Sequence, residues 1–168
     1  MKKSNYIVTI LLATFVFASF AFAEKTQIVN LTNTDKNITV GQKFTVTANY
    51  DTQSDEGSFG LGVRIHFDSN KVKFIGFKDS FIIGKTLEDT VAKDDTRSDF
   101  DQSTVTDKYV VIGWSATADF WPNMPTPVKL SDLLFEAIAP GGTQINVSFS
   151  SISSGYQSQA NNVLIDIQ

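Results

Sequence analysis

The sequence of 168 residues contains no cysteine. This absence excludes a disulfide framework, a thiolate metal site and a lipid-modified N-terminal cysteine, so stability has to come from burial of a hydrophobic core. Histidine is nearly absent too, because His66 is the only one. We expect His66 to face outward from a strand, with no serine or cysteine motif nearby. The sequence therefore gives no basis for a Ser-His-Asp mechanism.

Long hydrophobic runs are also missing, with one exception at the N-terminus. Residues 7–22 are almost entirely apolar, follow Lys2 and Lys3, and lead into Ala21-Phe22-Ala23. A basic head, an apolar middle and a small-x-small site predict a secretory signal peptide over residues 1–23. The alternative is a membrane anchor, but the run is short of the roughly 20 residues needed to span a bilayer. We expect a secreted protein, extracellular or periplasmic, with no stable membrane insertion after cleavage.

Basic residues are scarce in what remains. Removal of residues 1–23 leaves 12 basic residues against 18 acidic ones, because only Lys2 and Lys3 are lost. A negative net charge disfavours nucleic acid and anionic membranes as partners, since both carry negative charge. The remaining residues, 24–168, have the usual size of one domain.

Helical periodicity is hardly present, and the mature chain instead alternates with a period of two. Over residues 59–67, Phe59, Leu61, Val63, Ile65 and Phe67 share one face. Such alternation predicts strands with one face in a core and the other in solvent. Eight strands are expected, separated by turn motifs, at residues 27–31, 43–50, 59–67, 72–77, 109–115, 133–139, 143–151 and 162–167. Residues 128–134 fit a helical turn or the entry to a strand equally well. The pattern predicts an all-β sandwich.

Short motifs at the ends of these strands carry further information. Phe44-Thr45-Val46 follows Val40-Gly41-Gln42, one strand ends in Phe67-Asp68, and the next begins Val72-Lys73-Phe74. Leu133-x-Phe135-x-Ala137 then precedes the hairpin Gly142-Thr143-x-Ile145. Together these motifs resemble those of the bacterial cohesin domain. The resemblance covers nearly all of the mature chain. It implies a single jelly-roll sandwich of eight to nine antiparallel strands, shared with a related group of cellulose-binding modules.

The same resemblance implies a non-catalytic binding module. Cohesins hold dockerin-bearing enzymes through one face of the sandwich, and the related modules bind polysaccharide. We therefore expect a protein partner, dockerin-like or another surface protein, or an extracellular polysaccharide. Two alternatives stay open: a matrix or fibre subunit whose sheet edges pair between copies, and a small glycoside hydrolase with two carboxylates. No binding residue is carried over from the family.

Two segments outside the strands contain all the candidate site residues except Trp114. Residues 116–127 hold Phe120 and Trp121 among three prolines, and Trp114 ends the strand before them. Exposed aromatic rings bind sugars or anchor protein contacts, so Trp121, Phe120 and Trp114 are candidate ligand-binding residues. The alternative places Trp114 and Trp121 in the core.

The other segment, residues 84–107, is long and acidic. Calcium prefers several carboxylate oxygens in a loop that can wrap around the ion. Four carboxylates are therefore candidate calcium ligands: Asp94, Asp95, Asp99 and Asp101. The alternative is a solvated loop that keeps the surface negative.

Overall fold

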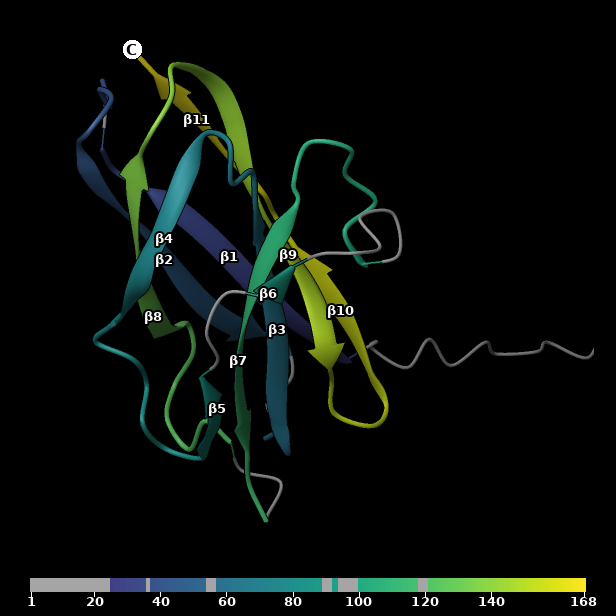
Figure 1. Cartoon of the computed structure of the whole chain (residues 1–168). Coiled ribbons are helices and arrows are strands. Elements are labelled where there is room, and N and C mark those ends of the chain that lie inside the picture. The colour runs from purple at the N-terminus through teal and green to yellow at the C-terminus, as the bar shows by residue number, and fades with distance from the viewer. Residues whose placement is uncertain (1–24, 36, 54–56, 89–91, 94–99, 118–120) are drawn as a thin grey trace, which may run out of the picture.

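The computed structural model describes residues 25–35, 37–53, 57–88, 92–93, 100–117 and 121–168 (Figure 1). The signal peptide predicted for residues 1–23 lies outside these ranges. Within the described residues, no helix is long and apolar enough to cross a membrane. The same residues form eleven strands: β1 (Lys25–Asn33), β2 (Lys43–Thr52), β3 (Gly60–Phe67), β4 (Val72–Lys78), β5 (Lys85–Glu88), β6 (Ala92–Lys93), β7 (Lys108–Ser115), β8 (Val128–Ala137), β9 (Gly141–Ser151), β10 (Tyr156–Ala160) and β11 (Val163–Ile167).

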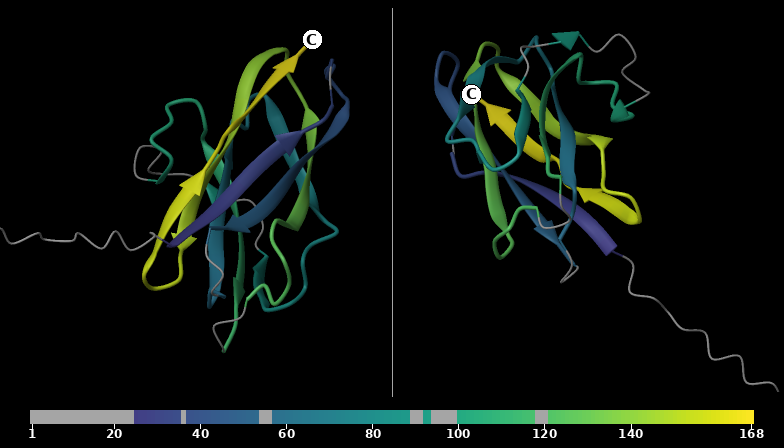
Figure 2. Two further views of the ribbon diagram at one scale, coloured as in Figure 1. Left: turned by 180° about the vertical axis from the view of Figure 1, so that it is seen from behind. Right: turned by 90° about the horizontal axis from the view of Figure 1, so that it is seen from below.

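The strands form two sheets that face one another (Figures 1 and 2). The five-stranded sheet has the order β10-β1-β2-β8-β4, and the six-stranded sheet has the order β11-β9-β3-β7-β5, with β6 also paired to β7. Each named pair is antiparallel except β1 with β10, which is parallel. The predicted all-β sandwich is confirmed. It has more strands than the eight to nine expected, and residues 128–134 belong to a strand, β8.

The core lies between the inner faces of the two sheets. Side chains alternate along β2, so that Phe44, Val46, Ala48 and Tyr50 are buried and the residues between them are partly exposed. Phe135 of β8 contacts the ring of Phe44 at 5.7 Å between centroids and further aromatic rings from β3 and β4. Interdigitated aromatic and β-branched side chains of this kind supply the apolar area that holds an aligned sandwich together.

The prediction for β3 is right for four of the five residues assigned to the inner face, and wrong for Phe59 and for most of the outer face. Leu61, Val63, Ile65 and Phe67 are buried as expected. Phe59 lies before the first residue of β3 and is exposed. The outer positions of β3 were expected to face solvent, yet Gly60, Gly62 and His66 are also buried. For His66 the reason is that another segment of the chain covers this part of the outer face, as described below. Gly60 lies close to the backbone of Trp114 and Ser115. Gly62 lies close to the side chains of Ser150 and Ser151.

Candidate functional site

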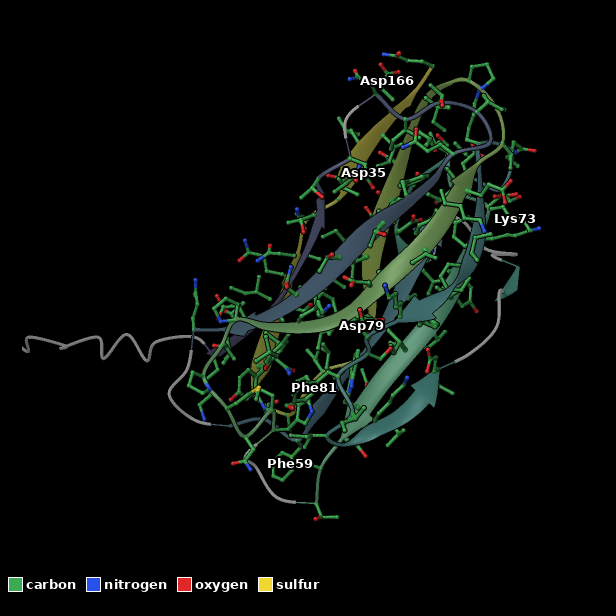
Figure 3. All side chains as sticks on the ribbon, turned by 90° about the vertical axis from the view of Figure 1, so that its left-hand side faces the viewer. Asp35, Phe59, Lys73, Asp79, Phe81 and Asp166 are labelled. Carbon is green, nitrogen blue, oxygen red and sulfur yellow. The ribbon has the colours of Figure 1, made fainter. Side chains whose placement is uncertain are left out.

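Four connections meet at one end of the sandwich, which we call the loop end: residues 57–59, 79–84, 121–127 and 152–155. They meet there because β2, β4, β7 and β9 run toward this end and β3, β5, β8 and β10 start from it. Figure 3 shows Phe59 and Phe81 at this end and Asp35 and Asp166 at the opposite one. The connection that contains Trp121 is therefore part of a larger surface made by four segments.

Trp121 is a buried residue of this end, with only 1% of its surface exposed. Its ring packs 4.7 Å from the ring of Tyr50, 5.9 Å from that of Trp114 and 6.0 Å from that of Phe81, measured between centroids. Trp114 is 3% exposed. Both indoles therefore lie in the core, which was the alternative to a role as exposed ligand-binding side chains. Phe120, the third candidate, lies outside the described residues.

The two indole N–H groups hold one connection in place. Trp121 Nε1 donates a hydrogen bond of 2.9 Å to the carbonyl of Ile83, and Trp114 Nε1 donates one of 2.7 Å to the carbonyl of Phe81. The amide of Phe81 donates in turn to the carbonyl of Leu130 in β8, at 2.7 Å. A buried indole N–H needs a partner, and here both partners are carbonyls of residues 81–84. The two buried tryptophans therefore hold the backbone of residues 81–84 in place from the core side.

A glycine in the same connection lets the chain pass close to β7. Gly84 has φ of +74°, and a Cβ atom at this position would lie 2.5 Å from the carbonyl oxygen of Ser115. The Gly84 carbonyl accepts a hydrogen bond of 2.7 Å from the Ser115 amide. Only glycine combines this backbone conformation with such a close approach. Residues 81–84 are thus fixed at both ends.

A buried polar network fixes the neighbouring connections. Gln27 of β1 is fully buried, and its Nε2 donates to the Tyr50 hydroxyl at 3.1 Å and to the Gly60 carbonyl at 3.0 Å. Its Oε1 accepts from the Ser153 amide at 2.7 Å. Burial raises the pKa of the Tyr50 hydroxyl, an effect that hydrogen bonds with Ser58 and Gln27 only partly offset. One glutamine side chain thus links β2, β3 and the connection before β10.

Sequence reasoning missed Gln27, because it is an ordinary polar residue in an alternating strand. Its burial follows from contacts with residues far along the chain, which a local pattern does not contain. The apolar run Phe81-Ile82-Ile83 was the available signal for this connection, since it lies outside any predicted strand.

The loop end carries exposed apolar side chains on this fixed backbone. Ile82 is 81% exposed, the largest value among the exposed large hydrophobic residues described. We call the exposed set the loop-end patch: Phe59, Ile82, Ile83, Met124 and Ile152. Apolar side chains held outward on a rigid backbone are typical of protein contact surfaces, where they bury area at little ordering cost.

Of the four candidate calcium ligands in the acidic segment 84–107, the structure describes only Asp101. Asp94, Asp95 and Asp99 lie outside the described residues. Asp101 accepts hydrogen bonds from Thr106 Oγ1 at 2.6 Å, from Asn146 Nδ2 at 3.0 Å and from the Ser103 amide at 3.1 Å. Among the described residues, no group of three or more His, Cys, Asp or Glu side chains could hold a metal ion. Asp101 therefore acts here as an anchor that ties residues 101–106 to β9.

This anchored segment corrects the prediction for His66. His66 is fully buried, with Nε2 2.7 Å from Ser148 Oγ and Nδ1 3.8 Å from Asp101 Oδ2. Its ring lies 5.5 Å from the ring of Tyr109 and 6.4 Å from that of Phe100, measured between centroids. The prediction of a surface histidine fails because residues 100–106 fold over the outer face of β3. Two-residue alternation cannot reveal such a cover.

Comparison with solved structures identifies the fold. The chain is similar to the cohesin in a type I cohesin–dockerin complex from Clostridium thermocellum, with a TM-score of 0.56 and 15% identity over 84% of this chain and 99% of that one. It is also similar to a cohesin module of a family 33 glycoside hydrolase from Clostridium perfringens, with a TM-score of 0.55 and 9% identity over 84% and 98%.

A third similar structure is the sixth cohesin of scaffoldin B from Acetivibrio cellulolyticus, in complex with a Cel5 dockerin. Its TM-score is 0.54, with 12% identity over 87% of this chain and 100% of that one. No protein-family model matches the sequence, and no curated protein matches it closely enough to count as a relative. The chain therefore has a cohesin-like jelly-roll fold, as the sequence motifs predicted.

Proposed function

We propose that this chain is an exported, non-catalytic module that binds a protein partner through the loop-end patch. The observation that carries the proposal is the set of exposed apolar side chains on connections fixed from below. Ile82 and Ile83 extend from the segment whose carbonyls accept the two indole N–H groups. Because the backbone is already ordered, little conformational entropy is lost when a partner covers these side chains.

The fold supports the same class of function. Two of the similar cohesins were solved as complexes with dockerins, so this sandwich is one that carries protein recognition. Export is supported by the predicted signal peptide over residues 1–23. The chemistry of the patch favours a protein over a polysaccharide, because sugar rings stack on flat aromatic faces and Phe59 is the one aromatic member of the patch. The other four side chains are aliphatic or flexible, as in protein contact surfaces.

A capture experiment tests the proposal by comparing how much partner protein is retained by the unchanged chain and by single-site variants of it. The immobilised protein is exposed to a panel of purified dockerins and to extracellular proteins of the producing organism, with an insoluble polysaccharide as a parallel matrix. Ile82→Asp should weaken retention by a factor of about 30, the equivalent of about 2 kcal/mol for an apolar anchor.

The control replaces an apolar side chain of similar exposure elsewhere in the fold. Leu164 of β11 is 75% exposed and lies in another part of the fold, so Leu164→Asp should retain the partner as the unchanged protein does. Equal losses for the two variants, or retention on polysaccharide alone, would contradict the proposal.

A further inference from the structure

A cavity of about 420 Å³ lies away from the loop end, between the segment that begins at residue 100, the outer side of β9 and the edge strand β10. Figure 1 shows the segment after residue 100 on the side of the molecule where β9 and β10 lie. Ser148 of β9 and Ser158 of β10 both line this cavity. Nothing argued for the loop-end patch uses it.

Ser148 contacts the only histidine of the chain. It lies on β9 two residues after Asn146, which is the partner of His66 in the register between β3 and β9. Ser148 Oγ is 2.7 Å from His66 Nε2. Ser148 is partly exposed, whereas His66 is fully buried. A serine that lines a cavity while its hydroxyl contacts an imidazole has the arrangement in which histidine acts as the base for a nucleophile.

A carboxylate lies on the other side of the imidazole. Asp101 Oδ2 is 3.8 Å from His66 Nδ1, and the Asp101 side chain is 1% exposed. Hydrogen bonds from Thr106 Oγ1 and Asn146 Nδ2 hold this oxygen in place. A negative charge on this side favours a proton on Nδ1, which leaves the lone pair of Nε2 for the Ser148 hydroxyl. Ser148, His66 and Asp101 thus lie in the order of a serine nucleophile, its base and an orienting acid.

A cationic group lies next to the serine. Arg64 of β3 is the register partner of Ser148 and lines the same cavity. Its guanidinium donates to the Phe149 carbonyl at 3.2 Å and lies 4.1 Å from the centroid of the Phe100 ring. A guanidinium has five N–H donors. Beside a carbonyl under attack, such a group stabilises the negative charge that develops on the carbonyl oxygen.

The burial of His66 limits what this arrangement can do. Its side chain has no exposed surface, and the rings of Phe100 and Tyr109 lie beside it, at 6.4 and 5.5 Å between centroids. The imidazole contacts the Ser148 hydroxyl but cannot reach a leaving group in the cavity. The acyl donor must therefore have a leaving group that departs as a stable anion. An acyl group on Ser148 would remain there, because the buried imidazole cannot contact the water that would remove it.

We propose that Ser148 is a nucleophile that takes one acyl group from an activated ester or thioester, with His66 as its base. In this step the Ser148 oxygen bonds to the acyl carbon, and the bond from that carbon to the leaving oxygen or sulfur breaks. The Ser148 proton moves to His66 Nε2, and the leaving group departs as a phenolate or a thiolate. The product is an ester on Ser148. Because the reaction stops there, it is a modification of the chain and agrees with the non-catalytic module proposed above.

4-Nitrophenyl acetate tests the proposal, because its leaving anion is stable and coloured. The purified exported protein should release about one equivalent of 4-nitrophenolate and then stop, and peptide mass spectrometry should locate one acetyl group on Ser148. Ser148→Ala should abolish the release, and His66→Gln should slow it by a factor of about 100 or more. Ser158→Ala is the matched control and should react as the unchanged protein does, since Ser158 lines the same cavity from β10.

A pair of cysteine variants keeps the test valid should Ser148→Ala or His66→Gln unfold. The chain has no cysteine, so Ser148→Cys and Ser158→Cys each introduce a single thiol. A histidine beside a thiol lowers the pKa of that thiol and raises its reactivity. Iodoacetamide should therefore alkylate Ser148→Cys faster than Ser158→Cys by a factor of about ten or more, although position 158 is the more exposed of the two.

Four results would overturn the proposal: no release of 4-nitrophenolate, release that survives Ser148→Ala, acetylation confined to another residue, or alkylation of Ser158→Cys at least as fast as that of Ser148→Cys. Continued release past one equivalent that depends on Ser148 would overturn the limit to a single acylation. Each result is independent of whether the loop-end patch binds a protein.

Discussion

Replacement of Trp121 by alanine should lower the free energy of unfolding, because the indole is part of the core and is not part of an exposed binding surface. The indole is 1% exposed, contacts the rings of Tyr50, Phe81 and Trp114, and donates a hydrogen bond to the Ile83 carbonyl. Truncation of a buried tryptophan to alanine costs about 3–5 kcal/mol, from lost burial and the cavity left behind. For a domain of this size that loss lowers the melting temperature by about 10–20 °C.

A milder variant separates the ring from its N–H group. Trp121→Phe keeps most of the aromatic volume but leaves the Ile83 carbonyl without its donor. The lost hydrogen bond is worth about 1 kcal/mol, and residues 81–84 should be released locally. Hydrogen exchange should therefore be faster at the Ser115 amide, which donates to the Gly84 carbonyl.

Met124 provides the control for these variants, because it lies in the same connection and is exposed. Met124→Ala should change the free energy of unfolding by no more than about 0.5 kcal/mol. Urea and thermal unfolding of the three variants decide the matter. A Trp121→Ala protein that melts within about 2 °C of the unchanged protein would refute the argument, because the indole would then be outside the core.

Three other predictions concern the rest of the fold. His66→Ala should cost about 1–3 kcal/mol in urea unfolding, since a buried hydrogen-bonded ring is lost, whereas exposed Lys73→Ala should cost at most about 0.5 kcal/mol. Partial burial opposes ionisation of Asp132, but hydrogen bonds from Thr47 and Lys129 outweigh it and lower its pKa. A lowered pKa stabilises the fold above the unfolded value of about 3.9 and loses this effect as pH falls through the folded value. The stability difference from Asp132→Asn should therefore be present at neutral pH and vanish in acid; a difference constant with pH would contradict it. The calcium hypothesis predicts a melting temperature raised by excess calcium and insensitive to it after Asp99→Asn with Asp101→Asn. A melting temperature unaffected by calcium or by a chelator would contradict the calcium hypothesis and favour the alternative of a solvated loop.

The architecture was accessible to sequence reasoning because its signals are local. Alternation along residues 43–50 and 59–67 reports which side chains face the core, and the motifs around Phe67-Asp68 and Leu133-x-Phe135-x-Ala137 indicated the jelly roll. The strand β10 escaped notice because Tyr156–Ala160 reads Tyr-Gln-Ser-Gln-Ala, with no apolar alternation. β10 pairs in parallel with β1, which is far away in the sequence, so no pattern within residues 156–160 indicates this pairing.

The site was less accessible because it depends on contacts between distant residues. Trp121 stands among prolines and so suggested a stiff, exposed loop, yet Tyr50 and Phe81 cover its ring from other parts of the chain. The hydrophobic side chains that remain exposed belong to neighbours such as Ile82. His66 was misjudged for the same reason, since its cover comes from residues 100–106, with Asp101 as the anchor.

The central claim is that a protein partner covers the loop-end patch, and site-specific photo-crosslinking tests it most directly. Benzoylphenylalanine is placed at the position of Ile82 in one preparation and at that of Leu164 in another, two positions of similar exposure in different parts of the fold. Each preparation is irradiated with the partner protein retained in the capture experiment. The account predicts a crosslinked product from position 82 and none from position 164. A product from position 164 alone, or from neither, would contradict it.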